Sequence, residues 1–174
     1  FDGCLKMNRG QLHSPLGGGI GNFFGAQVRT ARHSGCTVMG MKTRLTEMFG
    51  IELPIMLAGM GGVSYSDLVA AVSDAGGIGT FGAAPMSTEL LTSEMARVRT
   101  LTNKPFGVDL LTASPDSIER NIQAIINGGA SIYVAGLGVP REIIDVLHSH
   151  NILVGSMCGK VRHAVAAVAS GCDF

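Results

Sequence analysis

The sequence predicts an α/β fold of the (β/α)₈ TIM-barrel type, incomplete, with a disordered N-terminal extension. From Met41 onward, short apolar segments alternate with helical patterns at intervals of roughly twenty residues, which predicts parallel strands joined by right-handed crossovers. Glycines recur just after these segments, as expected for a barrel whose loops build one shared site. An open doubly wound sheet is the competing architecture, because a barrel needs about 250 residues and the chain has 174.

The first forty residues differ from the rest of the chain. They show neither helical nor strand-like apolar periodicity, so we expect residues 1–40 to be a disordered or non-native leader. The glycine cluster at residues 17–21 lacks the spacing of a phosphate-binding loop. Met41 starts a polar, helix-compatible stretch, and the predicted domain therefore covers residues 41–174. A basic, acid-poor transit peptide is the alternative interpretation of the extension.

The first predicted unit contains the most informative turn of the sequence. Residues 54–58 are apolar and predict a short buried strand that leads into the glycine-rich turn 59–62. Because glycine lets the backbone approach a ligand closely, this turn is a candidate wall of a cofactor site. A tight turn without any ligand fits the spacing equally well. Ser64 and Asp67 have the spacing of a capping box and predict that a helix opens at Ser64.

Further strand–helix units follow the first, about five in all, before the start of a sixth strand at residues 172–174. Ser114, Pro115 and Asp116 supply an N-cap, a first-turn proline and an acid for the third helix. The predicted strands are residues 78–81, 105–111, 131–135 and 152–155, and the predicted helices are residues 87–100, 114–127, 140–150 and 160–170.

Composition and charge argue against several classes of protein. Hydrophobic residues make up 46% of the chain and charged residues 15%, so the chain can bury a large core. Thirteen basic residues balance thirteen acidic ones, which indicates neither nucleic acid nor an anionic membrane as a partner. No apolar run approaches the roughly 18 to 20 residues of a membrane span, and no export signal is recognisable. We expect a cytoplasmic protein.

Metal-binding motifs are not found in the sequence. The four cysteines form no CxxC pair, and free thiols are expected. His148 and His150 are two residues apart on a predicted helix and cannot easily share a metal ion. His163 follows the fifth predicted strand, where a surface or packing role is favoured over that of a base. The sequence predicts no metal site.

Three segments together resemble a known family. Residues 54–62 (PIMLAGMGG), 68–79 (LVAAVSDAGGIG) and 101–111 (LTNKPFGVDLL) are similar to the first three βα units of the nitronate monooxygenase (2-nitropropane dioxygenase) family. That family consists of FMN-dependent barrels and includes the related flavin enoyl-acyl carrier protein reductases. The resemblance extends over residues 41–174 and implies the N-terminal half of such a barrel.

The resemblance also implies a flavin site at the ends of the first strands. Ala58, Gly59 and Met60 match the turn whose backbone lies along the flavin ring. Gly82 and Ala83 match the end of the second strand, near the same ring. These residues are therefore expected to bind FMN mainly through backbone atoms.

Two charged side chains are further candidates for binding FMN. Asp109 falls where many family members place an Asn, and a carboxylate there suits the ribityl hydroxyls better than the phosphate. A strand-end residue bonded to neighbouring backbone amides is the alternative role for Asp109. Lys160 stands near a predicted helix N-terminus and could reach the flavin phosphate.

The implied activity is the FMN-dependent oxidation of an alkyl nitronate by O₂ to a carbonyl compound and nitrite. The His associated with catalysis in the family lies beyond the position of Phe174, so no catalytic residue is assigned and the chain alone is expected to be inactive. The alternative enzyme is an NAD(P)H-dependent flavin reductase of enoyl thioesters. The alternative outside the enzymes is a non-catalytic gene fragment.

Overall fold

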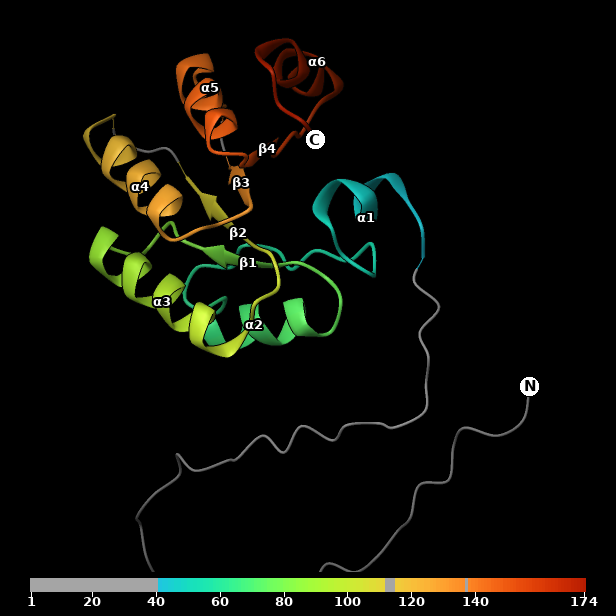
Figure 1. Ribbon diagram of the computed structural model, residues 1–174. Helices are drawn as coiled ribbons and strands as arrows, with labels where there is room; N and C mark the ends of the chain where they lie inside the picture. The colour runs from blue at the N-terminus through green and yellow to red at the C-terminus, as the bar shows by residue number, and fades with distance from the viewer. Residues whose placement is uncertain (1–40, 112–114, 137) are drawn as a thin grey trace, which may run out of the picture. The chain divides into compact units, whose positions relative to one another are not determined.

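The computed structural model describes residues 41–111, 115–136 and 138–174 (Figure 1). The predicted disorder of residues 1–40 and the predicted N-cap at Ser114 lie outside these residues. The helices are α1 (Arg44–Phe49), α2 (Ser66–Asp74), α3 (Thr88–Leu101), α4 (Pro115–Asn127), α5 (Arg141–Ser149) and α6 (Val161–Ser170). The strands are β1 (Gly79–Gly82), β2 (Phe106–Leu110), β3 (Ile132–Ala135) and β4 (Leu153–Ser156).

The four strands form a parallel sheet in the order β1-β2-β3-β4. The register pairs Gly82 with Asp109, Asp109 with Val134, and Val134 with Gly155, so the carboxyl ends of the strands meet at one edge. Helices α2 to α6 follow one another along one side of this sheet (Figure 1). A doubly wound sheet would reverse its strand order and place helices on both faces. The consecutive order within the described residues therefore favours the barrel arrangement.

Residues 54–58 pair with the sheet less regularly than predicted. Met56 forms an isolated parallel bridge with Ile78, and Gly61 forms another with Gly82. The Leu57 amide donates to the Ile78 carbonyl at 2.9 Å, and the Ile78 amide donates to the Ile55 carbonyl at 3.0 Å. The predicted place of this segment beside β1 is confirmed. The prediction of a continuous buried strand is wrong, because Met56 forms the one ladder bridge described within residues 54–58, and Ile55 and Ala58 are exposed.

Helix α1 is an element that the pattern of apolar residues did not reveal. Thr43 is its N-cap, and the side chains of Thr43 and Thr46 form a reciprocal capping box. Gly50 ends the helix with φ 65°, a left-handed conformation that glycine adopts without a Cβ penalty. Phe49 packs edge-on against Phe174, with ring centroids 4.9 Å apart.

The side chains of the strands alternate between two hydrophobic clusters. Tyr133 and Ala135 belong to the larger cluster, which the helices α2 to α5 cover. Ile132 and Val134 belong to the second cluster together with Phe49 of α1. This alternation is the period of two expected of a β-strand. Helix α1 therefore covers the face of the sheet opposite to the other helices.

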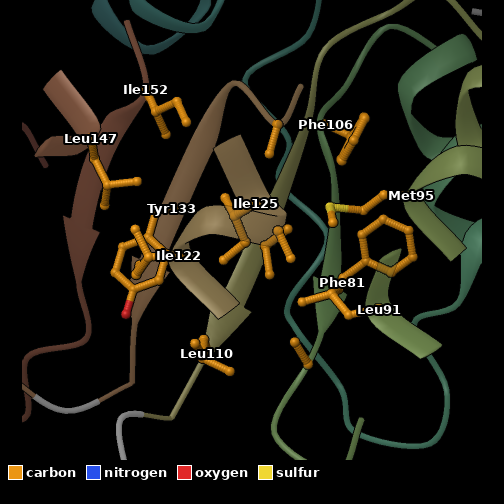
Figure 2. Packing of buried hydrophobic residues seen from close by; sticks show 14 of the residues in the cluster. Phe81, Leu91, Met95, Phe106, Leu110, Ile122, Ile125, Tyr133, Leu147 and Ile152 are labelled. Atoms are coloured by element: carbon orange, nitrogen blue, oxygen red, sulfur yellow. The ribbon is translucent and has the colours of Figure 1, made fainter. Parts of the chain in front are cut away.

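The larger cluster surrounds aromatic residues from three strands (Figure 2). Phe81 and Phe106 meet edge-to-face, with ring centroids 5.7 Å apart. Tyr133 is fully buried, and its hydroxyl has no hydrogen-bond partner among the described residues. Figure 2 shows this hydroxyl pointing toward the end of the sheet where Leu110 lies. Burial, followed by the charge of Asp109, raises the pKa of Tyr133 to about 12.

We expect the substitution Tyr133→Phe to leave the free energy of unfolding unchanged or to raise it by about 1 kcal/mol, because a buried unsatisfied hydroxyl costs about 1 to 3 kcal/mol. Urea denaturation measures this. The control Phe81→Ala removes a fully buried ring and should cost about 3 to 5 kcal/mol. A loss of more than about 1 kcal/mol in the Phe variant would show that the hydroxyl has a partner.

Candidate functional site

The candidate site lies where the turn at residues 58–61 meets the carboxyl ends of β1 and β2. A Cβ atom added at Gly59 would overlap with the Cβ of Asp109 and would lie 2.7 Å from its Oδ2. A Cβ atom added at Gly82 would lie 2.6 Å from the backbone nitrogen of Gly61. The turn therefore lies directly against both strands. The structure brings together the predicted residues Gly59, Gly82 and Asp109.

A buried serine holds the turn in place. The Ser64 hydroxyl accepts a hydrogen bond from the Met60 amide at 3.1 Å and donates one to the Ala58 carbonyl at 3.1 Å. Ser64 was predicted to cap α2, and this prediction is wrong. The N-cap residue is Tyr65, which makes no side-chain capping bond. The hydroxyl of Ser64 is instead used by the turn that precedes the helix.

Asp109 places a carboxyl group beside this turn. Its neighbours Val108 and Leu110 lie in the cluster under the helices, so the side chain of Asp109 lies on the opposite face of the sheet. The side chain is partly buried, and burial raises the pKa of its carboxyl group. No hydrogen bond to its carboxyl oxygens comes from a described residue. The alternative role as a carboxylate bonded to backbone amides thus finds no support among the described residues.

The remaining residues predicted for the flavin contribute in different ways. Ala58 and Met60 are exposed and leave the turn accessible from outside. Ala83 has its side chain in the core under the helices, and its amide donates to the Asp109 carbonyl at 2.8 Å. Ala83 could therefore face a ligand only with its backbone. Gly82 is buried by the turn itself.

Lys160 lies apart from this cluster. It is the exposed N-cap residue of α6, which follows β4, and its ammonium group makes no ion pair with a described residue. A cavity of about 360 Å³ lies between the ends of β3 and β4 and helix α6, and Gly136, Ser156, Met157 and His163 are among its lining residues. Gly136 also borders Asp109, because a Cβ atom at Gly136 would lie 3.7 Å from Asp109 Oδ1. Gly136 is thus the residue that the cavity lining and the surroundings of Asp109 have in common.

Residues 41–111, 115–136 and 138–174 contain no group of three or more His, Cys, Asp or Glu side chains placed to hold a metal ion. In the same residues, no helix is both long and apolar enough to cross a membrane.

Comparison with known proteins identifies the family. Residues 42–156 match the model of the family described as nitronate monooxygenase. The chain belongs to this family. Its members are flavin-dependent oxidoreductases.

Two curated relatives illustrate the range of the family. One relative is a (3aS,4S,5R,7aS)-5-hydroxy-7a-methyl-1-oxo-octahydro-1H-indene-4-carboxyl-CoA dehydrogenase from Mycobacterium tuberculosis. The two sequences are 33% identical over 135 residues, and this alignment covers 78% of this chain and 38% of the relative. The second relative is a probable nitronate monooxygenase from Staphylococcus aureus, which is 37% identical to this chain over 109 residues. This alignment covers 63% of this chain and 31% of the relative. The chain thus spans less than two fifths of the length of these relatives.

Two solved structures have a fold similar to that of this chain. FabK from Thermotoga maritima is similar with a TM-score of 0.72 and 30% identity, over 76% of this chain and 42% of that one. A nitroalkane oxidase from Streptomyces ansochromogenes is similar with a TM-score of 0.68 and 26% identity, over 74% of this chain and 46% of that one. The predicted (β/α)₈ TIM-barrel type is thereby confirmed.

Sequence reasoning missed two residues of the site. Ser64 was assigned to the helix, although its distance of four and six residues from Met60 and Ala58 also suits a bond back to the turn. Gly136 is one of the glycines that recur after the predicted strands, and the sequence does not single it out. Its place beside Asp109 depends on the register of β2 and β3, and no local signal in the sequence carries that register.

We expect Ser64→Ala to lower the free energy of unfolding by about 1 to 3 kcal/mol, because the turn loses two hydrogen bonds that each contribute about 0.5 to 1.5 kcal/mol. Ser66→Ala is the matched control, since the Ser66 hydroxyl is equally buried and has no partner among the described residues. That variant should cost nothing measurable in chemical denaturation. Equal losses of unfolding free energy in both variants would show that the Ser64 hydroxyl does not hold the turn in place.

A double-mutant cycle tests the contact between Gly59 and Asp109. Gly59→Ala should destabilise the chain by about 1 to 3 kcal/mol, because the added Cβ overlaps with that of Asp109. In an Asp109→Gly background the same substitution should cost clearly less, since the overlapping atom is gone. Urea denaturation of the four proteins gives the coupling energy. A coupling energy of zero would mean that the turn does not lie against β2.

Proposed function

We propose that this chain forms the N-terminal part of a cytoplasmic, FMN-dependent nitronate monooxygenase. The observation that supports the proposal is the family match over residues 42–156, joined to the exposed turn at residues 58–60 that Ser64 holds beside Asp109. The substrates are an alkyl nitronate and O₂, and the products are a carbonyl compound and nitrite.

The residues of the site fit a flavin. Ala58 and Met60 are exposed at the edge of the sheet, and Gly59 between them has no side chain to cover the backbone, which suits a planar ring. Gly82 and the backbone of Ala83 extend this surface. When bound, FMN supplies the electron-accepting chemistry, and the protein supplies binding and orientation.

Two side chains of this chain have separate roles toward the cofactor. Asp109 lies beside the turn, and no described residue donates a hydrogen bond to its carboxyl oxygens. In the proposed complex Asp109 hydrogen-bonds the flavin. Lys160, exposed and without an ion pair among the described residues, attracts the phosphate group. The helix N-terminus behind Lys160 adds a favourable dipole for an anion.

A second function is the reduction of enoyl thioesters by NAD(P)H through the same flavin. The similarity to a relative named for a carboxyl-CoA substrate favours this candidate, because that name indicates an acyl thioester as the ligand. The cavity beside helix α6, which Ser156 and Met157 line in part, could accept an apolar acyl group in this case. The two functions share the cofactor and differ in the electron donor, nitronate or NAD(P)H, and in the electron acceptor, O₂ or the enoyl thioester.

A chimaeric enzyme tests the proposed reaction. Residues 42–156 of this chain replace the matching segment of the probable nitronate monooxygenase from Staphylococcus aureus. We expect the chimaera to retain FMN and to release nitrite from propyl nitronate, whereas the 174-residue chain alone should release nitrite at the rate without enzyme. No residue of this chain is assigned as the catalytic base, and the loss of a positioned base alone lowers a reaction rate by about 10² to 10⁴.

The same chimaera separates the two candidate functions. Oxidation of NADPH that depends on crotonyl thioester, without nitrite release from propyl nitronate, would favour the reductase. A chimaera that folds but loses FMN would contradict the flavin site, and fluorescence of the released flavin measures this. The unmodified Staphylococcus aureus protein is the control for both assays.

A further inference from the structure

Helix α6 presents its branched apolar side chains away from the core. Val161, Val165 and Val168 have the spacing of one helical stripe, and these residues are 82%, 65% and 70% exposed. No residue of α6 is buried. The neighbouring helix α5 instead buries its stripe, with Ile144 and Leu147 at 1% and 0% exposed. An apolar stripe of this kind normally faces a core, so α6 carries a contact face that the described chain leaves open.

The opposite side of α6 faces the sheet with small and polar residues. His163, Ala166, Ala167 and Ser170 line the cavity of about 360 Å³ beside the ends of β3 and β4. Ala167 also packs against the larger hydrophobic cluster. The small residues therefore determine which side of α6 faces inward, and the valine stripe is available for another contact.

A groove continues the stripe toward helix α1. Val168 lines this groove of about 640 Å³ together with Leu45 and Met48 of α1 and with Phe174. Leu45, Met48 and Phe174 are only partly buried. In Figure 1 the C-terminal end of the chain lies between α6 and α1. The stripe and the groove together form one apolar surface, here called the α1–α6 surface: Leu45, Met48, Val161, Val165, Val168 and Phe174.

The α1–α6 surface borders an open edge of the sheet. The Asp173 amide donates to the Val154 carbonyl at 2.8 Å, and the Ser156 amide donates to the Phe174 carbonyl at 3.1 Å. Residues 172–174 therefore run beside β4 in the parallel direction. Among the described residues, no further segment pairs with their other side. An edge of this kind can pair with another strand.

The number of parallel segments indicates what can cover this surface. Residues 54–58, the four strands and residues 172–174 make six such segments, whereas a (β/α)₈ barrel closes with eight. A second copy of this chain would add six more and exceed that number. The later strand–helix units of a barrel would complete it. The alignments cover 38% and 31% of the two curated relatives, so most of the length of each relative lies outside the aligned part.

We infer that the α1–α6 surface is a docking site for the later strand–helix units of a family barrel, and that this chain binds those units when they are supplied as a separate polypeptide. The first strand of that polypeptide pairs beside residues 172–174. Its helix packs apolar side chains onto Val161, Val165 and Val168. This docking requires the barrel type of the fold and is independent of the proposed reaction with flavin.

Co-expression of two polypeptides tests the docking. The partner is the part of the probable nitronate monooxygenase from Staphylococcus aureus that follows the position matching Phe174. We expect a soluble one-to-one complex with the 174-residue chain, measured by size-exclusion chromatography with light scattering. Hydrogen exchange of the backbone amides in residues 172–174 should slow in the complex, because a strand of the partner covers this edge.

A pair of matched variants locates the contact. Val165→Asp should weaken the complex by about a hundredfold or more, because it buries a carboxylate without a partner in an apolar contact. Val146→Asp is the control, since Val146 lies on α5, is 45% exposed and is not part of the α1–α6 surface. That variant should keep the dissociation constant of the wild type in isothermal titration calorimetry. Both valines are exposed in the free chain, so neither variant should change its circular dichroism spectrum.

Three results would overturn the inference. The partner segment could stay insoluble beside this chain, although a complementary surface should keep it in solution. Val165→Asp and Val146→Asp could bind with equal affinity, which would place the contact elsewhere. The 174-residue chain could form a dimer that Val165→Asp dissociates, which would assign the surface to a second copy of the chain.

Discussion

The site depends on one steric constraint, the close approach of the turn at residues 59–61 to the ends of β1 and β2. Gly82 has no room for a side chain because the backbone of Met60 and Gly61 fills that space, and Gly59 has none because Asp109 fills it. The turn, the first strand of the sheet and the carboxyl group are therefore positioned together. A side chain at either glycine would move all three.

This constraint couples the site to the core. The hydroxyl of Ser64 links the turn to the start of α2, and Val69 of α2 belongs to the cluster that includes Phe81 of β1. Gly79 is needed at the same contact, because a Cβ there would overlap with the backbone of Val69. The position of the turn is thus determined by helix packing as much as by the glycines of the turn itself.

The order and the approximate limits of the elements from α2 to α6 could be predicted, because apolar periodicity, glycine stops and caps are local features of the sequence. Helix α1 was missed because it has only six residues and because its capping box pairs Thr43 with Thr46 and not with a Glu or Gln. The contact between Gly59 and Asp109 could not be derived from periodicity. It depends on strand register over fifty residues of chain, and the family resemblance alone indicated a shared site there.

The same steric constraint changes how the glycines of the turn are interpreted. Glycine at residue 59 was interpreted as space for a ligand, yet protein atoms already occupy the position of its missing side chain. Its presence is fully explained by packing, and it carries no evidence for a cofactor by itself. The indication of a ligand comes instead from Asp109, whose carboxyl group lies against the turn and accepts no hydrogen bond from a described residue. The exposed residues Ala58 and Met60 leave a way for a bound molecule to reach this carboxyl group.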